Sequence, residues 1–168
     1  MLRRGFTIVE IIIVITVMGI LLILGVVNLS SSQISSRDAE RKSDVETIAM
    51  HLETFYNSGT DGSSTIGRYP SIAEMTGLPS QIKNLRDIDP RSLKSPGETN
   101  TSLIGYNGGI DIPAINKYTY WPRKSDKSPC NATGDECRSF TIIYKLEKST
   151  PECPAMQSNQ CTLMSKNQ

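Results

Sequence analysis

Residues 5–27 read GFTIVEIIIVITVMGILLILGVV, and this stretch decides how the rest of the chain is organised. Its single charged residue is Glu10, and no proline interrupts it. The stretch is too hydrophobic all round to form one face of a soluble helix. With Asn28 and Leu29 it is close to the ~20 residues that cross a bilayer core of ~30 Å. We therefore predict a membrane-spanning helix over residues 6–29.

Basic residues flank only one end of this span. Arg3 and Arg4 precede it, and the next basic residue is Arg37. The positive-inside rule places the N-terminus in the cytoplasm and the remainder of the chain outside it. Two alternatives stay open, a cleaved secretory signal peptide and a plain uncleaved anchor. A signal peptide usually has a shorter apolar core, of ~7–15 residues.

The order of residues at the start of the span resembles a known family. A short basic leader ends at Gly5, Phe6-Thr7-x-x-Glu10 follows, and the apolar helix continues. This order resembles the N-terminus of type IV pilins and type II secretion pseudopilins. The resemblance implies that a prepilin peptidase removes residues 1–5 by cutting between Gly5 and Phe6. It also implies that the same enzyme methylates the new amino group of Phe6.

Glu10 needs an explanation, because an unpaired carboxylate costs roughly 2.5–3.5 kcal/mol or more at the bilayer centre. Cleavage would create an ammonium group at Phe6, and pairing would make the carboxylate tolerable in lipid. In a filament the partner can be the Phe6 amine of the neighbouring subunit, so that Glu10 sets the register of assembly. The alternative is that Glu10 lies at the membrane interface beside the headgroups.

Many pilins carry a proline where Val27 stands here, and in those proteins the helix loosens near that proline in the filament. Because this chain lacks the proline, any local unwinding of its helix would centre on the segment from Gly19 to Gly25.

After the span the pattern becomes amphipathic. A serine-rich joint leads into residues 37–56, where apolar side chains recur at spacings of three, four and seven. We predict one helix over residues 6–57, whose second half, residues 30–57, packs on a globular domain. Arg37, Arg41 and Lys42 would suit either a membrane headgroup layer or a solvated helix face.

Residues 58–168 are expected to form one compact head. Ser71 and Glu74 fit the capping box of a short helix, which Gly77 and Pro79 would end. Alternating patterns then predict strands, which lie at residues 103–106, 117–121 and 139–146. The predicted fold class is α+β, a long N-terminal helix packed on a small antiparallel sheet.

The four cysteines all lie in the last 40 residues, on the side expected to be outside the cytoplasm: Cys130, Cys137, Cys153 and Cys161. An oxidising compartment favours disulfides. We favour Cys130 with Cys137 and Cys153 with Cys161, because both bridges close short loops. Crossed pairing and a zinc site are the alternatives, although the spacing lacks the tight CxxC of zinc knuckles.

We find no catalytic constellation in the sequence and predict that the protein is not an enzyme. His51 is the only histidine, and no phosphate-binding loop is present. No cofactor is expected. Asp126, Asp135 and Glu136 could bind calcium, but they lack the regular spacing of a calcium loop.

The charge is nearly balanced, with 18 basic and 17 acidic residues. The sequence contains no stripe of basic residues, so an intrinsic nucleic-acid site is not predicted. The favoured function is a structural subunit that polymerises into a pilus or pseudopilus. As the resemblance implies, its partners would be prepilin peptidase, membrane lipid, other copies of the subunit, and an inner-membrane assembly platform with its ATPase. The alternative is a monomeric, membrane-anchored extracytoplasmic binding module.

Overall fold

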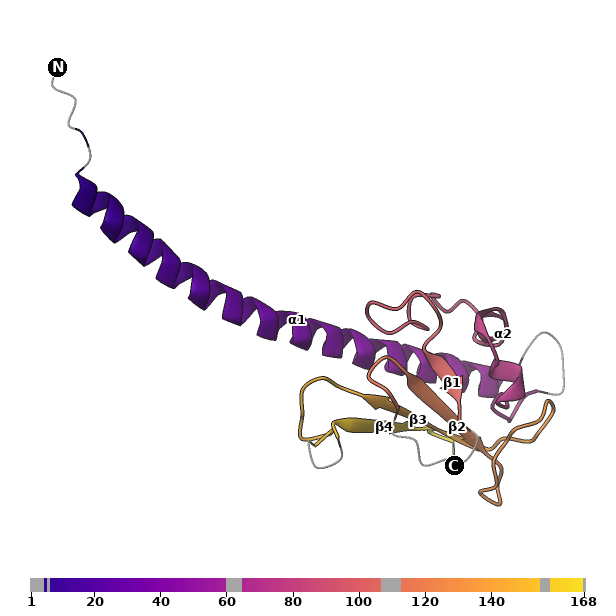
Figure 1. Ribbon diagram of the computed structural model, residues 1–168. Coiled ribbons are helices and arrows are strands. Elements are labelled where there is room, and N and C mark those ends of the chain that lie inside the picture. The colour runs from indigo at the N-terminus through magenta and orange to yellow at the C-terminus, as the bar shows by residue number, and fades with distance from the viewer. Residues whose placement is uncertain (1–4, 6, 60–64, 107–112, 155–157, 168) are drawn as a thin grey trace. The chain divides into compact units, whose positions relative to one another are not determined.

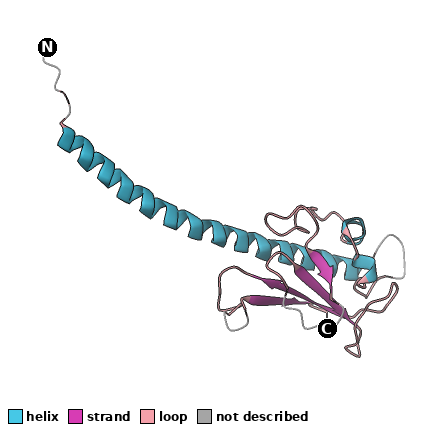
Figure 2. Cartoon of the chain, in the orientation of Figure 1, coloured by secondary structure: helices cyan, strands magenta, loops and turns pink. Residues whose placement is uncertain are grey.

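The computed structural model describes residues 5, 7–59, 65–106, 113–154 and 158–167. The chain divides into two compact units, Met1–Ser36 and Arg37–Gln168, and the long helix α1 (Ile8–Ser58) contributes to both. Figures 1 and 2 show α1 together with the strands and short helices of the second unit. The division between the units falls inside the helix, so the head includes the amphipathic half of α1.

In the first unit, the described part of α1 is solvent-exposed along nearly its whole length. It is a helix long and apolar enough to cross a membrane, as judged by length and composition. In the single chain the helix is continuous through Gly19 and Gly25, the segment where any melting in a filament would centre. A Cβ atom added at either glycine would meet nothing within 4 Å.

The second unit is built around a four-stranded sheet in the order β1-β2-β3-β4. Its strands are β1 (Leu103–Gly105), β2 (Tyr118–Arg123), β3 (Ser139–Lys145) and β4 (Gln160–Met164). The pairs β2–β3 and β3–β4 are antiparallel, but β1 runs parallel to β2. The α+β architecture is confirmed, and the sheet is mixed where an antiparallel one was expected. A three-residue strand carries too little pattern to reveal its direction.

The amphipathic half of α1 supplies one wall of the core. Five apolar residues of this half are buried: Val45, Ile48, Ala49, Leu52 and Phe55. Four of these five, all but Phe55, pack in one cluster with Tyr118 and Tyr120 of β2 and Phe140 of β3. Burying apolar side chains of this size contributes roughly 1.5–3 kcal/mol each. The sheet therefore acquires its hydrophobic core from the helix, as the periodicity of residues 37–56 predicted.

The segment before the sheet forms two short helices instead of one. The Ser71 amide donates to the Glu74 carboxylate at 2.8 Å, as a capping box requires, and the 3-10 helix η1 (Ala73–Met75) follows. Helix α2 (Leu78–Asn84) comes next and was not predicted. Pro79 lies in its first turn, where a missing amide hydrogen costs nothing. This proline begins a helix; it does not end one.

A buried ionic cluster ties α1 to the loop after β3. Asp38 accepts hydrogen bonds from the backbone amides of Glu147 and Lys148, both at 2.9 Å. Arg41, which is 3% exposed, donates to Asp38 and to Glu147, again at 2.9 Å each. Hydrogen bonds from Arg37, with others from Arg41, lower the pKa of the Glu147 carboxyl to about 2.

The same loop accounts for the basic residues at the start of the amphipathic half. Arg37 holds the Glu147 carboxylate through two hydrogen bonds, of 2.8 and 2.6 Å. Lys42 pairs with Glu152 at 2.6 Å. These cations are therefore engaged by acidic residues of the head, and the side chains of Arg37 and Lys42 stay 40% and 45% exposed.

A second buried carboxylate, Asp44, has a different environment. Tyr118 donates a hydrogen bond of 2.9 Å to it across the core. Burial raises the pKa of Asp44 to about 6, an effect that the Tyr118 hydrogen bond opposes. Asp44 is therefore held in a site that favours its protonated form.

We predict that Asp38→Ala lowers the free energy of unfolding by about 2–4 kcal/mol, because two amides and a buried guanidinium lose a partner. The fluorescence of Trp121, the sole tryptophan, would follow urea unfolding of the protein in detergent. Glu40→Ala, at an exposed position of the same helix, is the matched control. Equal unfolding midpoints for the two variants would contradict the role given to Asp38.

Asp44→Asn should stabilise the protein at pH 7. The folded pKa of about 6 lies above the ordinary 3.8, so the ionised carboxylate opposes folding increasingly as the pH rises through this window. An amide still accepts the Tyr118 hydrogen bond and carries no charge. The stability gain should disappear below about pH 4. Urea unfolding at several pH values measures it, with exposed Glu46→Gln as control. A gain that did not depend on pH would disprove this account of Asp44.

Candidate functional site: the start of the apolar helix

Glu10 lies in the first turn of α1, and its carboxylate folds back on Thr7. The Thr7 amide and hydroxyl both donate to Glu10 Oε2, at 2.8 and 2.7 Å. The Glu10 amide donates in return to Thr7 Oγ1 at 3.3 Å. This reciprocal arrangement is a capping box, and it satisfies amides that have no partner within the helix.

The capping box explains how the sequence begins the helix at this point. Thr7 precedes the first helical residue, Ile8, and Glu10 is the third residue of the helix. A carboxylate is also favoured at this end, where the helix dipole is positive. The spacing Thr-x-x-Glu is the same as that of Ser71 and Glu74, so this role could have been predicted from the sequence.

The residues around the expected cleavage point are only partly described. Gly5 is exposed, and a Cβ atom added to it would meet nothing within 4 Å. Phe6 and residues 1–4 lie outside the described residues. The hydrogen bonds that the structure gives to Glu10 are therefore those with Thr7.

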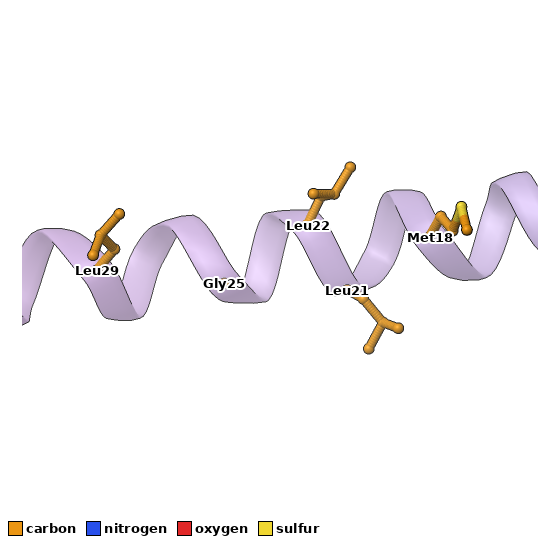
Figure 3. Close-up of a pocket in the computed structure, with 5 residues that line it drawn as sticks. All are labelled: Met18, Leu21, Leu22, Gly25 and Leu29. Atoms are coloured by element: carbon orange, nitrogen blue, oxygen red, sulfur yellow. The ribbon is translucent and has the colours of Figure 1, made fainter.

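Further along the helix, the side chains leave a groove at Gly25. The groove has a volume of about 460 Å³ and is lined by five residues: Met18, Leu21, Leu22, Gly25 and Leu29. Figure 3 shows Gly25 between Leu22 and Leu29 along the helix, with no side chain of its own to fill the space. Met18, Leu22, Gly25 and Leu29 are separated by four, three and four residues, the spacing of a helix-packing seam. The groove could not be predicted from the sequence, although Gly25 stands out there as a glycine inside the apolar span.

The cysteines are joined in the short-loop pairing favoured from the sequence. Cys130 is bonded to Cys137 and Cys153 to Cys161, with Cα–Cα distances of 5.8 and 4.8 Å. Each bond closes a loop that connects two neighbouring strands of the sheet. The cysteines thus constrain loops of the head.

The acidic residues considered for calcium are each engaged elsewhere. Asp135 pairs with Lys124 at 2.9 Å, and Glu136 pairs with Arg138 at the same distance. Asp126 accepts hydrogen bonds from the amide and hydroxyl of Ser128. In the described part of the chain, no three metal-ligating side chains gather into a group.

Comparisons with known proteins support the resemblance seen in the N-terminal motif. The chain is similar to the type IV major pilin protein PilA of Myxococcus xanthus (strain DK1622), with 26% identity over 122 residues. The match covers 66% of this chain and 56% of that protein, so the chain spans little more than half the length of this relative. No family model and no solved structure matches the chain. This similarity and the long apolar helix joined to an α+β head support the resemblance of the chain to the type IV pilins.

Proposed function

We propose that the chain is a structural subunit of a type IV pilus or of a related type II secretion-like pseudopilus, and not an enzyme. The observation that carries this proposal is an exposed apolar helix with a single carboxylate in its first turn. The similarity to a type IV major pilin supports it. In this proposal the apolar helix of the free subunit is embedded in membrane lipid. On assembly, the helices of neighbouring subunits replace the lipid around it.

Maturation comes first in this proposal. Arg3 and Arg4 hold the N-terminus in the cytoplasm, and the head lies on the other side of the membrane. Prepilin peptidase cuts between Gly5 and Phe6 and methylates the Phe6 amine. An inner-membrane assembly platform and its ATPase then extract the subunit into a filament that extends from the cell surface or into the periplasm.

Helix packing holds the filament together. Leu22 and Leu29 are 70% and 59% exposed in the single chain, and both border the groove at Gly25. Lipid tails are as apolar as leucine, so transfer from lipid gives little hydrophobic gain and close packing must supply the stabilisation. Glycine allows the backbones of neighbouring helices to approach closely. The groove is thus suited to receive a side chain from an adjacent subunit.

Glu10 has two separable roles in this scheme. In the single chain it caps the helix through Thr7. In the filament its charge pairs with the Phe6 ammonium of a neighbouring subunit, which favours one axial offset. Glutamine can also serve in a capping box, because its side-chain oxygen accepts the same hydrogen bonds. A change to glutamine therefore removes the charge and keeps the cap.

We predict that Glu10→Gln and Glu10→Ala are both processed normally but give few or no filaments. The measurement is the yield of sheared filaments, together with the mass of the membrane-bound subunit. Exposed Glu40→Gln, which lies in the head, should assemble as the unchanged protein does. Normal assembly of Glu10→Gln, with failure of Glu10→Ala alone, would show that the cap matters and the charge does not.

Gly5→Leu should block cleavage, because a bulky side chain crowds the peptidase site. Nothing lies within 4 Å of a Cβ atom at this position, so the fold itself should tolerate the change. The size of the subunit in membranes, compared by mass with that of Gly5→Ala, reports processing. A fully cleaved Gly5→Leu subunit would argue against maturation by prepilin peptidase.

A further inference from the structure

A second feature of the head, remote in sequence from the apolar helix, is a basic pocket where strands β2, β3 and β4 end or begin. It has a volume of about 310 Å³. Four cationic residues, two serines and one methionine line it: Arg123, Lys124, Lys127, Arg138, Ser125, Ser139 and Met164. No acidic residue is among the lining residues. The charge balance of the whole chain conceals this local concentration.

Two of the four cations are already paired. Lys124 contacts Asp135, and Arg138 contacts Glu136, at 2.9 Å each. Among the described residues, neither Arg123 nor Lys127 has a carboxylate within ion-pair distance. The pocket therefore holds two positive charges that the described part of the protein does not neutralise.

Arg123 is held in place before any ligand arrives. Its guanidinium lies 4.6 Å from the centroid of the Trp121 ring, and Nη2 donates to Thr141 at 3.2 Å. Its Nε is buried and has no hydrogen-bond partner. The ring contact and the hydrogen bond to Thr141 therefore fix the side chain through one face and one edge of its guanidinium.

Lys127 is presented by an ordered turn. Its amide donates to the Lys124 carbonyl at 3.0 Å, and the Lys124 amide donates to the Ser128 carbonyl at 2.9 Å. The disulfide between Cys130 and Cys137 closes the remainder of this loop. Both unpaired cations thus lie on a supported framework, and holding binding groups in place lowers the entropy lost on association.

We propose that this pocket binds one acidic sugar unit of a polysaccharide, such as a uronate. The Arg123 guanidinium and the Lys127 ammonium form ion pairs with the sugar carboxylate. The hydroxyls of Ser125 and Ser139 form hydrogen bonds with the sugar hydroxyls. The pocket volume is at the small end of the range for ligand sites, which suits a single ring with a charged substituent. This site is independent of the proposed filament function, because it lies in the head of a single chain.

The aromatic ring beside the pocket offers no free face on which a nucleic-acid base could stack. Proteins that bind single strands stack bases on free aromatic rings. The Trp121 ring contacts Arg123 and also Tyr106, whose ring centroid is 4.9 Å away. Those contacts occupy the ring that a base would need.

The test uses the full chain in detergent and an oligogalacturonide as the probe. Calorimetry measures the affinity, and Trp121 fluorescence reports ligand binding beside Arg123. An uncharged galactose oligomer is the neutral control, and oligothymidylate tests the nucleic-acid alternative. Because no filament is needed, failure of this test would leave the pilin proposal untouched.

Lys127→Gln and Arg123→Gln should each weaken oligogalacturonide binding about tenfold, as expected for one lost ionic contact. Lys83→Gln removes an exposed lysine of α2 and should leave the affinity unchanged. Lys127→Gln alters only an exposed side chain, so it stays informative even if Arg123→Gln disturbs the fold. The proposal is overturned by no saturable binding, by an equal loss in Lys83→Gln, or by tighter binding of oligothymidylate.

Discussion

A carboxylate at the start of an otherwise uncharged apolar helix is the constraint on which this protein depends. Between Gly5 and Ser36 the sole charged residue is Glu10. The capping box with Thr7 gives that carboxylate hydrogen-bond donors, and it gives the helix a defined beginning. A capped carboxylate still keeps its charge. Proximity to a cation is what would make it tolerable in lipid, and the proposed filament of processed subunits would offer one.

The stability of the head depends on a different contact, because a small sheet needs another element to bury its inner apolar face. The amphipathic half of α1 provides that partner through Val45, Ile48 and Leu52. Asp38 then fixes the loop after β3 to the helix, with Arg41 completing the cluster. Buried ion pairs are weak contributors to stability when compared with apolar packing, but removing one partner is costly. The cluster therefore serves to hold the loop in one position.

Much of this structure could be predicted from periodicity and composition. The extent of the long helix, its amphipathic half and strands β2 and β3 follow from patterns that run over many residues. Strand β1 was predicted at residues 103–106, but its parallel pairing with β2 was not. Helix α2 and strand β4 are short, and the placement of α2 depends on tertiary contacts such as those of Gln81, which donates to the Met75 and Leu103 carbonyls. The Thr7 cap was visible in the spacing. The basic pocket was not, because Arg123 and Arg138 meet only when β2 pairs with β3.

Mass spectrometry of the N-terminal peptide from native cells tests the central claim most directly. The account predicts a peptide that begins at Phe6 and carries one additional methyl group. That result would place the ammonium where Glu10 needs a partner. A peptide that retains Met1 to Gly5 would contradict the account and indicate a plain membrane anchor. Cleavage after Leu29 would contradict it as well, because the soluble head would have lost the apolar helix.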